Sequence, residues 1–195
     1  PAYDNDLTAT LDLPAVDDAI WNAVETVDAA SMKECAFHCV DCRIPSLRGS
    51  INDAIEDEGG IEQVNVFAQM LSQRQRVWDT ASFTKYKALL DASGNPNLEQ
   101  AIELAKELDQ YELRPEIAEP WDYTEVILRE KYPDLPEELF QTPQAAWIGQ
   151  KWLEQGDAAI TDYGLIRRKD GGPLPCFRQE QAQQTQFQRG GMEMR

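Results

Sequence analysis

The sequence contains a single histidine, His38, and only 18 lysines and arginines against 35 aspartates and glutamates, a formal net charge of −17. A surface of this sign repels nucleic acid and anionic membranes and attracts basic protein surfaces. No run approaches the ~18–20 apolar residues that cross a bilayer. The first residues are acidic and show neither a basic segment nor an apolar one, so no signal peptide is expected. We therefore expect a cytoplasmic protein with no direct contact to nucleic acid or membrane.

Signatures of catalysis are equally scarce. One histidine and the lack of GxSxG and HExxH patterns leave few groups for nucleophilic or zinc-dependent hydrolysis. Gly59-Gly60 and Gly171-Gly172 are isolated pairs, which predict a helix end and a turn and not a phosphate-binding loop. Carboxylate pairs are too numerous in so acidic a chain to mark a catalytic site. We expect no enzymatic activity, no catalytic residues and no cofactor.

Three of the four cysteines lie within Glu34-Cys-Ala-Phe-His-Cys-Val-Asp-Cys-Arg43. This clustering makes a poor disulfide framework and favours a reducing compartment. The CxxxCxxC spacing resembles that of radical S-adenosylmethionine enzymes, but Asp41 stands where that family has an aromatic residue. Cys35, His38, Cys39 and Cys42 also number the four ligands of a structural zinc site. No second pair of ligands follows, and we interpret Cys35 to Ile44 as a half-buried strand, with no metal bound.

Helical patterns dominate the rest of the chain. Apolar residues at helical spacing predict helices from Pro14, over 50–58, from Ile61 and over 78–90. Asn97 is expected to cap the next helix, and Thr142-Pro143 to start a later one. Tyr111 to Pro115 is expected to be a short strand or extended piece, and the segment 158–167 a strand or hairpin. The predicted fold class is α+β, helix-dominated with few short strands and built of small modules.

The charge is distributed in blocks, which suggest the module boundaries. Residues 1–62 carry a net charge of −11, residues 63–97 of +2, residues 98–157 of −10 and residues 158–195 of +2. We predict an acidic module over 1–62, a near-neutral helical module over 63–97, an acidic module over 98–175 and a mobile tail over 176–195. Acidity that served solubility alone would be spread more evenly.

The second acidic block contains a regular pattern. Glu99, Glu103 and Glu107 stand four residues apart, so that one helix face would carry a carboxylate about every 6 Å. The phosphates of one DNA strand follow each other at ~3.4 Å, so this ladder approximates every second phosphate. The candidate partner-binding carboxylates of both blocks are Asp53, Glu56, Asp57, Glu58, Glu62, Glu99, Glu103, Glu107, Asp109, Glu112, Glu116, Glu119, Asp122 and Glu125.

Four segments resemble a known family: LDLPAVDDAIWNAV, INDAIEDEGGIEQVNVFAQMLS, NLEQAIELAKELDQYELRPEI and YPDLPEELFQTPQAAWIGQKWLEQGDAAITDYGLIRR. Over most of residues 11–170 the chain is similar to ArdA-type antirestriction proteins, especially the divergent ArdA-like group on mobile elements of gut bacteria. The resemblance implies an elongated, modular α/β homodimer. It also implies a DNA mimic that occupies the DNA-binding groove of type I restriction–modification enzymes, without catalytic residues.

Two alternatives remain at this point. The acidic surface could mimic DNA for another target, such as a CRISPR nuclease or a nucleoid protein. The chain could instead be a metal-binding domain or enzyme that uses Cys35, Cys39 and Cys42.

Overall fold

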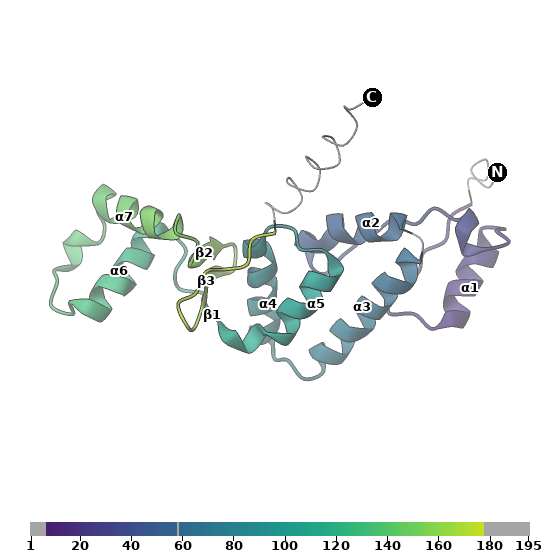
Figure 1. The fold of residues 1–195 in the computed structure, drawn as a ribbon, viewed down its shortest axis with the longest axis horizontal. Helices are drawn as coiled ribbons and strands as arrows, with labels where there is room; N and C mark the ends of the chain where they lie inside the picture. The colour runs from purple at the N-terminus through teal and green to yellow at the C-terminus, as the bar shows by residue number, and fades with distance from the viewer. Residues whose placement is uncertain (1–6, 58, 178–195) are drawn as a thin grey trace, which may run out of the picture. The chain divides into compact units, whose positions relative to one another are not determined.

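The computed structural model describes residues 7–57 and 59–177, which form two compact units, one up to Asp79 and one from Thr80 onward (Figure 1). The first unit contains α1 (Asp17–Thr26), η2 (Met32–Glu34), η3 (Pro45–Leu47), α2 (Arg48–Glu56) and α3 (Gly60–Gln75). The second contains α4 (Thr80–Ser93), α5 (Leu98–Lys106), η4 (Leu108–Gln110), β1 (Tyr111–Arg114), α6 (Pro120–Lys131), η5 (Glu137–Leu139), α7 (Pro143–Leu153), β2 (Ala158–Thr161) and β3 (Gly164–Arg168).

The α+β class and the helix-dominated architecture are confirmed, with one three-stranded antiparallel sheet among the described residues. Most of the predicted tail lies outside the part of the chain that the structure describes. No helix within that part is long and apolar enough to span a bilayer.

The first unit is built around α3, whose apolar stripe buries Ile61, Val64 and Phe67. A buried polar side chain on the same helix attaches the segment before α1. Asn65 accepts a hydrogen bond from the Ala15 amide at 2.8 Å and donates one to the Ala15 carbonyl at 2.9 Å. Because both groups of this buried amide are satisfied, the contact avoids the desolvation penalty of an unpaired polar atom.

The predicted strand from Cys35 to Ile44 is wrong. This segment has neither strand nor helix, and two side chains from α2 take the place of a neighbouring strand. The Cys39 amide donates to Asn52 Oδ1 at 2.8 Å, and Arg48 Nε donates to the Cys39 carbonyl at 3.2 Å. Residues that favour a pleated surface are not sufficient for a strand, because an isolated strand has no partner for its backbone groups.

The second unit is organised by its sheet, in the order β1-β3-β2 with both pairs antiparallel. Helix α4 packs on all three strands and buries Tyr86, Leu89 and Leu90. The Tyr86 hydroxyl donates to the Ala101 carbonyl at 2.8 Å, which ties α4 to α5, and burial raises the pKa of this tyrosine. The sheet and α4 therefore form the base on which α5 is held.

A helical hairpin, α6 and α7, completes the second unit (Figure 1). Its aromatic core includes Tyr123 and Trp152, whose rings meet edge to face with centroids 6.1 Å apart. The helices approach closely at Gly149, where a Cβ would lie 1.9 Å from the Pro120 carbonyl oxygen. Beside this point Thr124 Oγ1 donates to the Ala145 carbonyl at 2.7 Å.

The charge blocks do not coincide with the packing units. The predicted boundary between residues 62 and 63 falls inside α3, and the near-neutral block is divided between the two units. Charge is a property of exposed side chains, whereas a unit is defined by buried ones, so the two patterns are independent.

Gly149→Ala should destabilise the second unit, because the new methyl group would overlap the backbone carbonyl of Pro120, which cannot move aside as a flexible side chain could. We expect a loss of about 2 kcal/mol or more in the free energy of unfolding, measured by urea denaturation. Gly49→Ala is the matched control, since nothing lies within 4 Å of a Cβ at this helical glycine. It should be neutral or stabilising by about 0.5 kcal/mol, and equal losses in both variants would contradict the close approach.

Candidate partner-binding surface

Helix α5 presents the acidic ladder on its exposed side, and its ends and inner face are well fixed. Asn97 and Gln100 form a capping box, in which each side chain accepts from the other residue's backbone amide at 2.9 Å. Leu98, Ala101 and Leu104 are buried on the opposite face. These contacts hold the helix without using the ladder residues.

Glu99, Glu103 and Glu107 are all exposed and line one shallow groove of the second unit. Within the described residues Glu103 is the one ladder member with an ion pair, to Lys106 Nζ at 2.6 Å. An exposed pair of this kind contributes roughly 0–1 kcal/mol and is easily exchanged for another cation. Glu99 and Glu107 have their carboxylates available to a partner.

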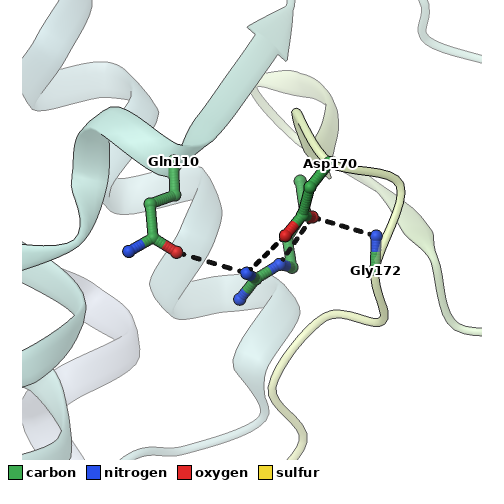
Figure 2. Close-up of polar contacts among 4 residues, drawn as sticks. Gln110, Asp170 and Gly172 are labelled. Atoms are coloured by element: carbon green, nitrogen blue, oxygen red, sulfur yellow. Dashed lines mark hydrogen bonds and ion pairs between the residues drawn. The ribbon is translucent and has the colours of Figure 1, made fainter.

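The groove is also lined by Arg168, whose charge is already matched by Asp170 (Figure 2). Arg168 lies over the ring of Tyr111, with 5.7 Å from its Cζ to the ring centroid. Its Nε and Nη2 donate to the two carboxylate oxygens of Asp170 at 2.9 and 2.8 Å, and Nη2 also donates to Gln110 Oε1 at 3.2 Å. This fork leaves little of its charge to offset the ladder.

The pKa shifts follow from this contact. Hydrogen bonds from Arg168, and then from the Gly172 amide at 3.0 Å, hold the pKa of Asp170 well below its ordinary range. The hydrogen bond to Asp170 raises the pKa of Arg168 in turn. Both groups are therefore charged throughout the neutral range.

The chain beyond β3 follows this fork and forms the rest of the groove. The Leu174 amide donates to the Gly156 carbonyl at 2.8 Å, and the Phe177 amide donates to the Ser93 carbonyl at 2.9 Å. Pro173, Leu174 and Phe177 supply apolar lining opposite the acids. The surface thus combines a row of carboxylates with an apolar wall.

Three of the predicted carboxylates that follow the ladder in the sequence form ion pairs within the chain. Glu112 pairs with Arg167, its neighbour across β1 and β3. Glu116 pairs with Arg114 at 2.6 Å and Glu125 with Arg129 at 2.7 Å. Arg167 lies 55 residues from Glu112 in the sequence, so the local charge pattern gives no sign of this ion pair.

The start of α6 uses two more of the predicted carboxylates. Glu119 is the N-cap of this helix and forms a capping box with Asp122. The carboxylate of Asp122 accepts from the amides of Ala118 and Glu119 at 3.1 and 2.9 Å. Asp109 remains exposed, and the structure gives it no ion pair among the described residues.

In the first unit, Asp53, Glu56, Asp57 and Glu62 are exposed around the turn from α2 to α3, while Glu58 lies outside the described residues. This turn depends on two glycines. Gly59 has a φ of +79°, and a Cβ at Gly60 would lie 1.8 Å from the Ala54 carbonyl oxygen. The tight reversal brings the end of α2 and the acidic first turn of α3 together.

The cysteine segment does not assemble a metal centre. Among the described residues no group of three or more His, Cys, Asp and Glu side chains is placed to hold an ion. His38 is exposed, and the thiols of Cys35, Cys39 and Cys42 are half-buried.

The comparisons with known proteins add no relative. No protein family, curated protein or solved structure matches this chain.

Sequence patterns did not indicate the Arg168 fork or the apolar wall of the groove. The residues concerned come from separate parts of the chain, and only the β1–β3 pairing brings them beside α5. The local sequence Arg168-Lys-Asp170 does carry a short-range signal, since a charged pair at this spacing can close a turn.

Asp170→Asn should lower the stability of the second unit at neutral pH, because it removes the charge that holds Arg168. The pKa of Asp170 is lower in the folded chain than in the unfolded one, so its contribution is present above about pH 4 and is lost as pH falls further. The difference in urea midpoint between wild type and variant should therefore be largest near pH 7 and shrink below pH 4. A difference that is constant with pH would contradict the ion pair.

Proposed function

We propose that this chain is a non-enzymatic DNA mimic that occupies the basic DNA-binding groove of a type I restriction–modification enzyme. Its carboxylates would meet the lysines and arginines that normally contact phosphate. The antirestriction role follows the resemblance to the ArdA family, and the physical support comes from the second unit.

The observation that carries the proposal is the α5 ladder. Glu99 and Glu103 lie on α5 and Glu107 follows it as the C-cap residue, and all three are exposed. A helix rises about 6 Å over four residues, a spacing comparable to that of alternate phosphates on a strand. Like charges at this spacing cost ~0.2–0.5 kcal/mol per pair, so folding alone does not favour them. Binding to a basic surface recovers this cost, because the partner's cations relieve the repulsion.

The surroundings of the ladder support the same role. Arg168, which lines the groove, has its charge matched by Asp170 and does not neutralise the glutamates. Glu112, Glu116 and Glu125 have intramolecular partners and contribute less to any docking surface. Glu99, Glu103 and Glu107 are therefore the strongest candidates for partner contact, with Asp109 beside them.

The exposed acids of the first unit, Asp53, Glu56, Asp57 and Glu62, would extend the contact to further cations of the enzyme. We include in the proposal a homodimer as the active form and the cytoplasm as the site of action, both on the resemblance to the ArdA family. Neither requires a cofactor or a catalytic group.

Glu99→Gln, Glu103→Gln and Glu107→Gln combined should weaken binding to the methyltransferase core of a type I enzyme by about tenfold or more at low salt. The affinity of the wild type should fall steeply between about 50 and 200 mM salt, and that of the variant less steeply, because fewer ions are exchanged on binding. Calorimetry or surface-immobilised binding measures both quantities.

Asp134→Asn, Glu137→Gln and Glu138→Gln form the matched control. These three acids are also exposed and lie between α6 and α7, so the control removes the same charge from another part of the unit. Its affinity should stay within about twofold of the wild type, because net charge alone acts weakly at a distance. An equal loss in both variants would point to a general effect of charge and contradict a defined surface.

A restriction assay in cells tests the biological role. Expression of the chain should raise transformation by unmodified DNA in a host with an active type I system. If transformation does not rise and the purified core is not bound, the proposal fails. Capture of a CRISPR nuclease or a nucleoid protein in its place would favour the alternative target.

A further inference from the structure

The proposed function leaves the CxxC pair Cys39-Val-Asp-Cys42 without a role. Both thiols are half-buried, and each donates to a nearby carbonyl, Cys39 to Asp41 at 3.3 Å and Cys42 to Ile44 at 3.1 Å. The first of these bonds places the Cys39 sulfur against the carbonyl of Asp41, the residue bonded to Cys42, so the two cysteines lie close together in the folded segment. The geometry therefore favours a disulfide between these two residues.

The backbone around the pair fits such a closure. The segment contains no helix or strand whose hydrogen bonds would have to break. Its central residue, Cys39, is bound by two side chains of α2. The Asn52 and Arg48 side chains bind the amide and the carbonyl of Cys39. A disulfide requires a sulfur–sulfur distance of about 2.05 Å and a Cβ–S–S–Cβ dihedral near ±90°, which an irregular segment can reach by small torsional changes.

The third cysteine of the cluster has a different contact. Cys35 Sγ donates to the Ser31 carbonyl at 3.7 Å, on the side of the segment that leads back to η2. Cys35 Sγ thus lies on the side away from Cys42, whereas Cys39 Sγ lies against the residue bonded to Cys42, so Cys39 and Cys42 should pair in preference to either pairing with Cys35.

We propose that Cys39 and Cys42 form a reversible disulfide by exchange with a small-molecule disulfide such as oxidised glutathione. One cysteine thiolate attacks a sulfur of the oxidant and expels one glutathione thiolate, leaving a mixed disulfide. The second cysteine thiolate attacks the protein sulfur of that bond and expels the other glutathione thiolate. Two protein thiols are oxidised, the oxidant is reduced to two thiols, and the two cysteine protons pass to the expelled thiolates.

Proximity determines both the selectivity and the rate of this exchange. Burial, and then the neighbouring Cys42, raise the pKa of Cys39, so little of its thiolate is present at neutral pH and the first attack is slow. The second attack is intramolecular and fast, because the two cysteines belong to one short segment and lie close together in it. A mixed disulfide at this pair should therefore not accumulate, whereas one at an isolated cysteine should.

Disulfide closure also affects α2, the helix that carries two of the exposed acids of the first unit. Asn52 and Arg48, which hold Cys39, belong to the helix that carries Asp53 and Glu56. A torsional change at Cys39 acts directly on these two hydrogen bonds. The oxidation state of the pair is thus coupled to the start of α2.

The test uses the full chain with Cys176→Ser, which removes the exposed cysteine of the second unit. Adding Cys35→Ser leaves only Cys39 and Cys42. After equilibration in buffers of increasing oxidised-to-reduced glutathione ratio and acid quench, intact mass should fall by about 2 Da as the disulfide forms, without a glutathione adduct. Retention of both thiols in fully oxidised glutathione, or a stable adduct on either, would overturn the proposal.

Two further variants in the Cys176→Ser background test the choice of partner. Cys39→Ser leaves Cys35 with Cys42, and Cys42→Ser leaves Cys35 with Cys39. Each should need a glutathione ratio at least about tenfold more oxidising to form an intramolecular disulfide, or should end as a glutathione adduct. Equal midpoints in all three pairs would show that the proximity of Cys39 and Cys42 confers no selectivity. Serine changes each site little, and circular dichroism of the reduced proteins checks that all of them are folded.

Discussion

The antiparallel pairing of β1 with β3 is the contact on which the second unit depends. It joins two segments more than fifty residues apart and places Glu112 opposite Arg167 and Tyr111 opposite Arg168. It also buries Ile166 at the centre of the sheet against α4. Because strand register determines which side chains face each other, one pairing sets the core contact, the neutralisation of Arg167 and the position of the groove beside α5. A shift by one residue would disrupt all three together.

The acidic face of α5 is tolerated because the helix is stabilised by other means. Burial of its apolar face contributes about 25 cal/mol for each Å² removed from water, which outweighs repulsion of a few tenths of a kcal/mol between successive glutamates. The capping box satisfies amides at the helix start. The ladder residues are thus free of structural duties, and their charge is available for binding. Glu119 and Asp122 illustrate the opposite case, since their carboxylates are consumed by the start of α6.

Local patterns in the sequence were sufficient for most helices. Asn97 and Thr142 were recognised as helix starts because capping uses residues three positions apart. The Cys35 to Ile44 segment is an exception, because residues that favour a strand form one only where a neighbouring strand can pair with them. The Glu112–Arg167 ion pair and the Gln110–Arg168 hydrogen bond could not be predicted, because they depend on a strand register that periodicity does not determine. Predictions therefore succeeded where the interaction is local and failed where it is tertiary.

The same distinction between local and tertiary interactions determines which carboxylates of the chain can bind a partner. A net charge counted along the sequence treats every carboxylate alike, and on that basis residues 98–157 form one continuous acidic block. In the folded unit, many carboxylates of that block already form ion pairs or cap a helix, so they are less available to bind a partner protein. Glu99, Glu107 and the acids at the α2–α3 turn stand out because they lack such duties. A mimic of DNA needs carboxylates that are both regularly placed and uncommitted, and fixing α5 through its caps and its buried face provides both conditions at Glu99 and Glu107.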